Sequence, residues 1–520
     1  MSSSQTTKQK DVRTSNILSA VAVADLIRTS LGPRGMDKMI IDAKEQVTIS
    51  NDGATIMSNL ELQHPAARML IDLSKAQDVE AGDGTTSVVV LAGSLLRAAH
   101  RLLEKGLHAA KIFEGFGIAW RRATEIMEDL ALPVDLNDHS ILEQNATTSL
   151  SSKVVSHSAD ILAPLAVKAV TSVVDPSIAD NVDLNNIRVV CKVGGTIEDT
   201  RLVEGLVFPQ GAIRASGSPT RVENAKIGLI QFCLSAPKSD MESTIIVSEY
   251  EQMDRVLREE RKYVLSLIKT IKKSGCNVLL IQKSILRDAV GDLALHYLGK
   301  LGILAIKDIE RSEIDFISRS TGALPVASIE GFTSDKLGHA QLVEQLSTPG
   351  GKIVEVTGCS LAKNPTISVL VRGSNNLVVA EAERSIHDAL CVVRSLVKRK
   401  ALLVGGGAAE VECAQRLNSM ARTESGLVGH CLRAFADALE VIPITLAENA
   451  GLNAIQTLTA LRKAHSDGQR FAGVDVRRGK VSDMQELEVL QPLLVNTSAL
   501  SLAVEYVRML LKIDDIVSCR

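Results

Sequence analysis

One β-α-β alternation in the middle of the chain, with long helical stretches on both sides of it, constrains the fold most. Residues 276–282 and 303–309 are short apolar runs rich in valine, isoleucine and leucine, which is typical of buried strands. Between them, residues 284–300 carry apolar side chains at helical spacing. Because strands that alternate with helices favour a parallel sheet, the middle of the chain is predicted to be an α/β domain.

The rest of the chain is arranged almost symmetrically about this domain. Apolar periodicity predicts helices at residues 16–31, 66–82, 85–103, 111–130 and 253–275, and mostly helix after residue 376. Strand-like segments lie at 187–230 and 353–372, and residues 145–160 are interpreted as a small, polar connection. A chain of 520 residues favours about three domains, and the symmetric order predicts nested domains whose first and last thirds pack together.

Composition and charge argue against several functions. The net charge of -3 and the 2% of aromatic residues give no reason to expect nucleic acid. The first 16 residues are polar, and no apolar run approaches the roughly 20 residues that span a bilayer, so no membrane association is expected. Eight scattered cysteines without a CxxC pair, and ten histidines without ligand spacing, predict a cytoplasmic protein with neither a disulfide framework nor a zinc site.

The segment GDGTTS, residues 82–87, has the chemistry of a phosphate loop at the start of a helix. Its glycines let the backbone approach a phosphate, and the helix that follows offers free N–H groups and the positive end of its dipole. Thr85, Thr86 and Ser87 add hydroxyl donors, and Asp83 can reach a phosphate through Mg²⁺. The alternative is an ordinary Asp-Gly turn with a threonine cap. Neither GxxxxGK[ST] nor GxGxxG occurs, so the two common nucleotide-binding motifs have no support.

Three further loops have a similar character. Residues 31–35 (LGPRG) and 51–55 (NDGAT) place glycine in tight turns, and residues 404–410 (VGGGAAE) place three glycines before a helix. Each is weak alone, because Gly-Pro and Asn-Asp-Gly are ordinary turn signals. Four such loops in one largely helical protein favour a nucleotide-binding site.

Two ionisable residues outside these loops are candidates for chemistry at that site. Asp388 lies beside the apolar stripe of a predicted helix over residues 381–397, where a carboxylate could orient and deprotonate a water. The residues alone favour a simpler interpretation, an exposed aspartate paired with Arg384 one turn earlier. Lys153 could contact a γ-phosphate, although its spacing favours a solvated loop lysine. His387 is interpreted as a structural neighbour rather than as a metal ligand.

Seven segments, taken together, identify a family. They occur in family order across the whole chain, and the set is specific although no single member is: TSLGPRGMDKMI, TISNDGATI, AGDGTTSVVVLAG, TSLSSKVV, ERSIHDALCVV, VGGGAAE and LAENAGLN. On these segments the chain resembles the group II chaperonins of the TCP-1 family, to which the eukaryotic cytosolic chaperonin CCT/TRiC belongs. One departure is Ala409, which stands where many relatives have proline and leaves the adjacent glycines in place.

The resemblance implies the chaperonin fold, a multidomain α and α/β architecture. Its implied segments are residues 1–138 and 400–520 for a helical equatorial ATPase domain, 139–207 and 367–399 for an intermediate hinge domain, and 208–366 for an α/β apical domain. A helical protrusion of the apical domain is expected over about 237–272.

The resemblance also implies a function. Chaperonins of this kind are ATPases whose paralogous subunits assemble into a hetero-oligomeric double ring. The ring binds unfolded proteins, including actin and tubulin, and closes a chamber around them as ATP is hydrolysed with Mg²⁺. Two segments interpreted as apical helices, 284–300 and 335–346, are expected to contact these clients. Reversing charges there, as in Asp335→Lys with Glu344→Lys, is expected to alter client binding and to leave ATP hydrolysis unchanged.

Roles for single residues follow from the same resemblance. Asp388 would be the catalytic base, Asp52 would flank the attacking water with it, and Asp83 would bind Mg²⁺. The nucleotide would be bound by Gly32, Pro33, Gly53, Gly84, Thr85, Thr86, Ser87, Ser152, Lys153, Gly405, Gly406 and Asp475. Within this set, Ser152 and Lys153 would sense the γ-phosphate, and Asp475 would approach the ribose.

Two other functions stay open at this point. A phosphotransferase acting on a small substrate would need a second pocket with a group that positions the nucleophile, and the sequence shows no such constellation. A ring subunit that binds clients but barely hydrolyses ATP is opposed by the presence of Asp83, Asp52 and Asp388, although slow exchange of ATP leaves no trace in a sequence.

Overall fold

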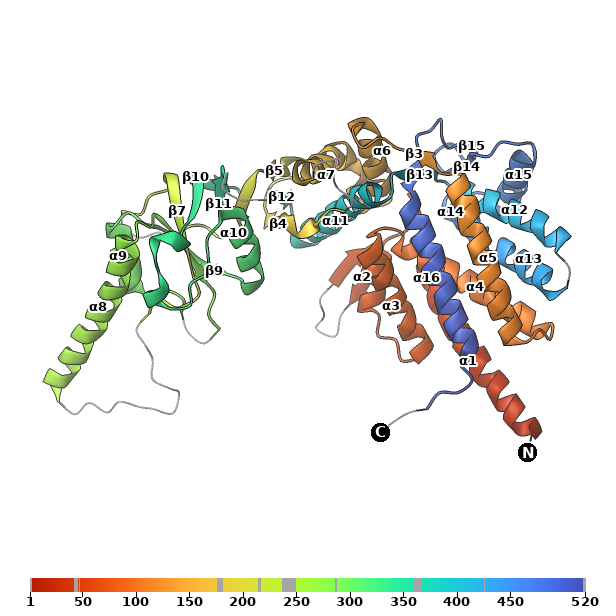
Figure 1. The fold of residues 1–520 in the computed structure, drawn as a ribbon, viewed down its shortest axis with the longest axis horizontal. Helices are drawn as coiled ribbons and strands as arrows, with labels where there is room; N and C mark the ends of the chain where they lie inside the picture. Colours follow the sequence, from red (N-terminus) through yellow and green to blue (C-terminus); the bar gives the residue numbers. More distant parts are fainter. Residues whose placement is uncertain are drawn as a thin grey trace. The chain divides into compact units, whose positions relative to one another are not determined.

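The protein divides into two compact units in the computed structural model, which describes residues 2–41, 45, 47–174, 181–213, 217–235, 249–285, 288–359, 366–424 and 426–517 (Figure 1). Unit 1 comprises residues 1–170, 174–182 and 381–520, and unit 2 comprises residues 171–173 and 183–380. Both ends of the chain therefore belong to one unit, as the symmetric order of the sequence predicts.

A long apolar helix forms the centre of unit 1. Helix α4 (Thr85–Glu104) begins after Gly84, whose left-handed φ of 76° suits glycine. The helices that pack against it most extensively are α1 (Ser2–Arg28), α3 (Pro65–Glu80), α13 (Leu427–Leu439) and α16 (Leu493–Lys512). At Gly93 a β-carbon would lie 2.4 Å from Cβ of Ala24, so α1 approaches α4 closely at a glycine. Most residues of α4 are buried as a result.

The first and last thirds of the chain share this core. Helix α5 (Ala109–Asp129) packs against α13, and the rings of Phe116 and Phe435 meet edge to face with centroids 5.5 Å apart. The two thirds also share a sheet, in which β13 (Ala401–Val404) pairs antiparallel with β3 (Leu132–Pro133) and with β16 (Leu490–Pro492). The prediction that the two thirds pack together is confirmed.

The remaining elements of unit 1 carry the loops of interest. Antiparallel pairs are formed by β1 (Lys38–Ile41) with β2 (Val47–Ser50) and by β14 (Ala472–Asp475) with β15 (Lys480–Asp483). Further helices, wholly or mostly in this unit, are α2 (Gly53–Asn59), α6 (His139–Leu150), α7 (Ala159–Val173), α11 (Asn376–Lys398), α12 (Ala408–Thr423), α14 (Val441–Asn449) and α15 (Ala454–Ser466). Because α6 continues to Leu150, the prediction of a connection over 145–160 is wrong in its first part.

Unit 2 is built on a mixed six-stranded sheet. Its strand order is β6 (Gly205–Phe208), β11 (Gly351–Thr357), β10 (Gly338–Thr348), β7 (Arg221–Ile230), β8 (Val278–Gln282) and β9 (Leu304–Ile309). Strands β7, β8 and β9 are parallel, and α8 (Tyr250–Lys273) and α9 (Asp292–Lys300) connect them, since parallel neighbours need a crossover. The predicted β-α-β alternation is confirmed.

A smaller sheet accompanies it in unit 2. Strand β12 (Ile367–Gly373) runs parallel to β4 (Ile187–Val193) and antiparallel to β5 (Arg201–Val203). All residues of β12 are buried, which explains why its sequence is largely apolar without alternation. Helix α10 (Ile314–Thr321) follows β9 in the chain.

Two helices predicted for the middle of the chain need correction. Helix α9 begins only at Asp292, and residues 288–291 before it are not helical. The predicted helix over 335–346 is wrong, because residues 338–348 form strand β10. The apolar side chains of this segment fit helical spacing over a short window. The segment is nevertheless a strand, because its backbone pairs with β7 on one side and with β11 on the other. In the expected protrusion, residues 237–248 lie outside the described residues, and α8 begins at Tyr250.

Among the residues that the structure describes, three helices are long and apolar enough to cross a membrane when length and composition alone are considered. They are Thr85–Glu104, Val154–Val173 and Leu493–Lys512, and they correct the prediction that the sequence contains no such run. Between 44% and 61% of each apolar window is buried within the protein, so the protein core accounts for much of this apolarity.

Candidate nucleotide-binding site

The loops predicted to bind a nucleotide meet at one cavity of unit 1. The cavity has a volume of about 1070 Å³, which is large enough for a nucleotide because small-molecule sites typically measure ~300–1,000 Å³. The predicted residues that line it are Gly32, Pro33, Asp83, Gly84, Thr85, Thr86, Ser87, Ser152, Lys153, Gly406 and Asp475.

Four predicted residues do not line the cavity: Asp52, Gly53, Asp388 and Gly405. Gly405 donates its N–H to the carbonyl of Val489 at 2.9 Å, and a β-carbon on it would lie 3.1 Å from the Val489 side chain. Gly407 lines the cavity in its place. The glycine run therefore reaches the cavity through Gly406 and Gly407 rather than through Gly405 and Gly406.

Backbone donors at the N-terminus of α4 face the cavity. The first N–H groups of a helix have no acceptor within the helix, and residues 85–87 occupy that turn here. Gly82 and Gly84 precede it with φ of 71° and 76°, and Oδ1 of Asp83 accepts a hydrogen bond from the N–H of Gly84 at 2.7 Å. Such a terminus attracts anions, so a phosphate group fits at this end of the cavity.

Asp52 connects two helices next to the cavity. It caps α2, and its Oδ2 accepts hydrogen bonds from the N–H and the hydroxyl of Thr55 at 2.9 and 2.8 Å. Its Oδ1 accepts one from Oγ1 of Thr85 at 2.8 Å. Burial by itself would raise the pKa of Asp52, but the charge of Lys153 and these hydrogen bonds outweigh it and lower the pKa. The carboxylate of Asp52 is therefore charged and fixed in position.

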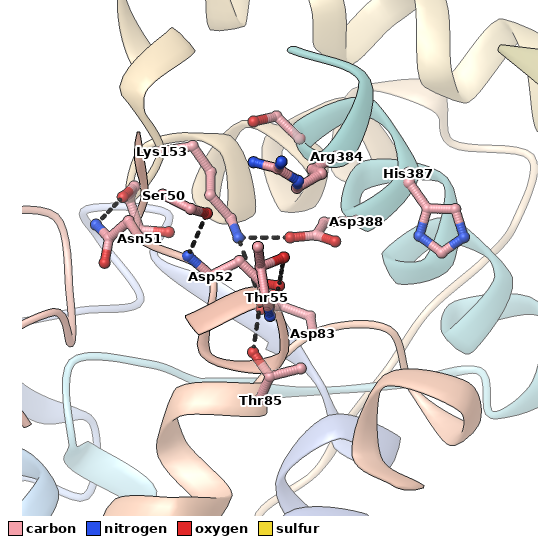
Figure 2. A network of polar contacts seen from close by, with 12 residues as sticks. Ser50, Asn51, Asp52, Thr55, Asp83, Thr85, Lys153, Arg384, His387 and Asp388 are labelled. Atoms are coloured by element: carbon pink, nitrogen blue, oxygen red, sulfur yellow. Dashed lines mark hydrogen bonds and ion pairs between the residues drawn. The ribbon is translucent and has the colours of Figure 1, made fainter. Parts of the chain in front are cut away.

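Lys153 joins the two predicted catalytic carboxylates (Figure 2). Its Nζ lies 2.6 Å from Oδ2 of Asp388 and 3.9 Å from Oδ1 of Asp52. The side chain is only 8% exposed, so the interpretation of Lys153 as a solvated loop lysine is wrong. Burial disfavours its charged form, but the nearby charges of Asp388, Asp52 and Asp83 outweigh burial and raise its pKa.

Asp388 on α11 is buried as well, at 6% exposure. Arg384, the partner that sequence spacing favoured, instead donates to Glu381 at 2.6 Å, so the interpretation of Asp388 as an exposed, Arg384-paired residue is wrong. Burial raises the pKa of Asp388 well above its usual value; Lys153 opposes this shift and the neighbouring carboxylates add to it. A raised pKa makes a carboxylate a better proton acceptor near neutral pH.

Several buried polar atoms at the cavity have no hydrogen-bond partner among the described residues. They are Oδ1 of Asn51, Oγ of Ser149, Oδ2 of Asp475 and Nδ2 of Asn496. Buried polar atoms nearly always have a hydrogen-bond partner, so this cavity fits a ligand that carries both donors and acceptors. A nucleotide has both.

Asp475 shows how such an atom would be used. Its Oδ1 accepts hydrogen bonds from the N–H groups of Arg477 and Arg478 at 2.9 and 3.0 Å. These bonds hold the carboxylate in place, while Oδ2 accepts no hydrogen bond from the described residues and lies 3.8 Å from Nε of Arg478. A hydroxyl group, such as those of ribose, is the donor that this position fits.

Some residues at the cavity were missed by the sequence analysis. Asn51 and Gly407 adjoin predicted residues, so the same loops contained a signal for them. Ser149 lies in helix α6 within the segment TSLSSKVV, which gave it no role of its own. Asn496 lies in helix α16, where no motif marks it, so its position at the cavity follows only from the fold.

Gly53 lies where helix α2 approaches the first turn of helix α4 closely. A β-carbon on it would lie 2.7 Å from N of Thr86 and 2.8 Å from C of Thr85, both backbone atoms that cannot give way alone. We expect Gly53→Ala to destabilise the protein by about 1–3 kcal/mol, as overpacking does, and to weaken nucleotide binding because the first turn of α4 must shift. Urea unfolding and titration with a fluorescent ATP analogue measure the two effects.

Gly117 offers a matched control for Gly53. It lies inside α5, and a β-carbon there would meet only the flexible side chain of Arg508, at 3.5 Å or more. Gly117→Ala should leave binding unchanged and stability equal or higher, since alanine favours helix over glycine. Equal binding by Gly53→Ala and Gly117→Ala would show that the α2–α4 approach is irrelevant to the site.

Comparison with known sequences gives the class of protein. Residues 23–520 match the TCP-1/cpn60 chaperonin family, and the chain belongs to this family. The family and the multidomain α and α/β chaperonin fold predicted from the sequence are thus confirmed.

Within the family the chain is similar to proteins named T-complex protein 1 subunit delta. It is 59% identical to the one from Homo sapiens, over 99% of this chain and 95% of that protein. It is 58% identical to that of Dictyostelium discoideum and 56% to that of Arabidopsis thaliana, each over 99% of this chain and 96% of the relative. The sequence of residues 225–242 and 276–289 by itself resembles the delta subunit, and this resemblance is confirmed.

Proposed function

We propose that this chain is an ATP-hydrolysing subunit of a cytoplasmic, hetero-oligomeric double-ring chaperonin, assembled with paralogous subunits. It would bind unfolded proteins, actin and tubulin among them, and assist their folding through ATP-driven closure of a chamber. The observation that carries the proposal is the cavity of unit 1, which is lined by the N-terminus of α4 and by polar atoms without hydrogen bonds. Next to it lie the carboxylates of Asp52 and Asp388, which Lys153 holds. Membership of the family supports the folding role, and the delta-subunit relatives support the paralogous partners.

ATP and Mg²⁺ fit the residues of the cavity. Mg²⁺ would be held by Asp83, an oxygen ligand of the kind it prefers, and would supply charge neutralisation on the phosphates. The N–H groups of residues 85–87 would bind phosphate oxygens, and the glycines at 32 and 406 let the backbone come close. Asp475 would accept a hydrogen bond from a ribose hydroxyl. The low aromatic content and net charge still predict no binding of nucleic acid.

Asp388 would take the proton of the attacking water, with Asp52 beside it. In the structure Lys153 holds Asp388, so the base becomes free only when this ion pair breaks. A γ-phosphate carries more negative charge than one carboxylate and therefore attracts the ammonium more strongly. Lys153, with the neighbouring Ser152, would in this way respond to the γ-phosphate and release the base when ATP is bound.

The division into equatorial, intermediate and apical domains is part of the proposal. Unit 1 contains the proposed equatorial segments, 1–138 and 400–520, and unit 2 contains the proposed apical segment, 208–366. The proposed intermediate segments, 139–207 and 367–399, are divided between the two units. A hinge that links ATP hydrolysis to closure would lie in such shared segments.

Of the two segments predicted to be client-facing helices, 284–300 and 335–346, only the first contains a helix, α9. We therefore propose α9 as the client-facing element. Asp292, His296 and Lys300 are exposed on it, while Ala294 and Leu298 are buried. We expect Asp292→Asn with Lys300→Gln to change the crosslinking yield to an unfolded client and to leave ATP hydrolysis unchanged, because surface substitutions usually alter stability by less than about 0.5 kcal/mol. Unchanged crosslinking would remove α9 from the recognition surface.

The mass of the native complex and its ATPase activity test the proposal together. A species many times heavier than one chain that contains several paralogues and hydrolyses ATP would support it. A single chain that transfers phosphate to a small molecule would overturn it in favour of a phosphotransferase. An assembled ring in which this subunit keeps its ATP unhydrolysed would leave the chaperonin class intact and overturn the ATPase.

A further inference from the structure

A cluster of metal-ligand side chains lies beside Asp388. One ligand atom from each of Asp78, His387 and Asp388 lies within 4.8 Å of the other two. Sγ of Cys391 lies 3.7 Å from Nδ1 of His387. Figure 2 shows His387 and Lys153 on different sides of Asp388, and the Lys153 ion pair engages only one of the two carboxylate oxygens of Asp388.

Two helices hold this cluster in a fixed frame. His387 and Cys391 are four residues apart on α11 and share a face, while Asp78 lies near the end of α3. Nη2 of Arg394 donates to the carbonyls of Val79 and Glu80 at 3.0 and 3.2 Å, which holds the end of α3 against α11.

A glycine brings the two helices close at this point. A β-carbon on Gly82 would lie 2.1 Å from Cβ of Cys391, so the turn after α3 approaches α11 more closely than any other residue would allow. The cluster is therefore positioned by the fold and does not depend on a flexible loop.

We infer that Asp78, His387, Asp388 and Cys391 form a zinc-binding site. The set offers nitrogen, oxygen and sulfur, the donors that Zn²⁺ binds in tetrahedral geometry, whereas Mg²⁺ prefers oxygen alone. Donor atoms around a tetrahedral zinc lie roughly 3.3 Å apart at bond lengths of ~2.0–2.1 Å. The ligand atoms of Asp78, His387 and Asp388, now within 4.8 Å of one another, reach that arrangement by side-chain shifts of less than about 1 Å. Cys391, whose Sγ lies 3.7 Å from Nδ1 of His387, would be the fourth donor.

An ion can reach the cluster through His387 and Asp78, while Cys391 lies buried behind them. His387 is exposed and Asp78 is half-buried, so an ion can enter from solvent. In the described part of the chain the Asp78 carboxylate has no hydrogen-bond or ion-pair partner that an ion would have to displace. The thiol of Cys391 would lose its proton on binding, because thiolate is the ligand form. Zinc motifs with Cys and His at fixed spacing are absent from the sequence because these donors come from two helices.

The consequence rests on the proposed function. A cation bound to one oxygen of Asp388 withdraws negative charge from the whole carboxylate and lowers its affinity for the proton of water, so zinc at this site would inhibit ATP hydrolysis. Binding of the ion itself involves no nucleotide and can be measured separately.

Cobalt(II) is the probe for binding, used with the full chain in the absence of nucleotide and Mg²⁺. We expect tetrahedral Co²⁺ absorption with a thiolate charge-transfer band, and displacement of Co²⁺ by Zn²⁺. His387→Ala should lower the affinity at least about tenfold, since the loss of even an outer-shell partner typically costs 10–100-fold. Cys391→Ser should remove the thiolate band. His296→Ala, at an exposed histidine of α9 in unit 2, should change neither.

Hydrolysis rates with and without Zn²⁺ then separate the two inferences. Inhibition of the unsubstituted chain, with a smaller rate ratio in His387→Ala, supports the inhibitory site. Equal Co²⁺ affinity in His387→Ala, Cys391→Ser and the unsubstituted chain overturns the zinc site even if ATP is hydrolysed normally. Intact Co²⁺ binding in a chain that never hydrolyses ATP overturns the ATPase proposal and leaves the zinc site standing.

Discussion

Replacing Asp388 by alanine is expected to slow ATP hydrolysis about 10²–10⁴-fold, the usual cost of losing a positioned general base, while ATP stays bound. The reason for retained binding is structural: Asp388 is buried on α11 and does not line the cavity, so the nucleotide keeps its contacts. Single-turnover hydrolysis of labelled ATP measures the first effect. Retention of nucleotide on this subunit alone measures the second, because paralogous subunits of an assembled ring would mask a bulk rate.

Two further variants sharpen this test. Asp388→Asn keeps the shape of the side chain and an oxygen for Lys153 but cannot take a proton, so it should be as slow as the alanine variant. Asp72→Ala removes an exposed aspartate of α3 and should hydrolyse ATP normally. If Asp388→Asn fails to retain ATP, the residue holds the nucleotide and the role of base is mistaken.

The loops that we propose to bind phosphate could be located in the sequence because their chemistry is local. Gly84 has a left-handed φ of 76° and Gly406 has one of 65°. In the sequence, each is a glycine shortly before a predicted helix. A helix N-terminus provides the same N–H groups whatever the rest of the protein does. Loop, helix and anion preference could thus be inferred together from six or seven residues.

The ion pair of Lys153 with Asp388 could not be predicted in this way. Spacing along α11 offered Arg384 as the partner of Asp388, and nothing near Lys153 indicated burial. The two residues are far apart in the sequence and meet only through tertiary structure. Only the resemblance to chaperonins placed them in one site.

The prediction of a helix over residues 335–346, where strand β10 lies, failed for a related reason. Its window has apolar side chains whose spacing fits either a helix or a strand, and β7 and β11 supply the hydrogen bonds that decide. Local periodicity contains no information about such partners. Glu344 lies between Glu355 of β11 and Arg221 of β7 in the sheet. Its reversal to lysine would therefore change cross-strand charge pairs on both sides as well as the surface.

Replacing Asp83 by alanine is expected to weaken the binding of Mg-ATP by at least about tenfold, since the ion would lose a direct oxygen ligand. Isothermal titration with ATP in Mg²⁺ gives this affinity. The same titration in the presence of a chelator should not show this loss of affinity. Without the ion the carboxylate of Asp83 only repels phosphate, so replacing Asp83 by alanine should leave the affinity for free ATP equal or higher.

The asparagine variant separates a metal ligand from a turn residue. Oδ1 of Asp83 accepts a hydrogen bond from the N–H of Gly84, and the amide oxygen of Asp83→Asn can accept the same bond without the charge. If Asp83 serves only the turn, Asp83→Asn binds Mg-ATP like the unsubstituted chain and only Asp83→Ala is impaired. If Asp83 holds Mg²⁺, both variants lose affinity for Mg-ATP and neither loses affinity for free ATP. The pattern across two variants and two ionic conditions therefore identifies the role without reference to the rate of hydrolysis, which other residues also control.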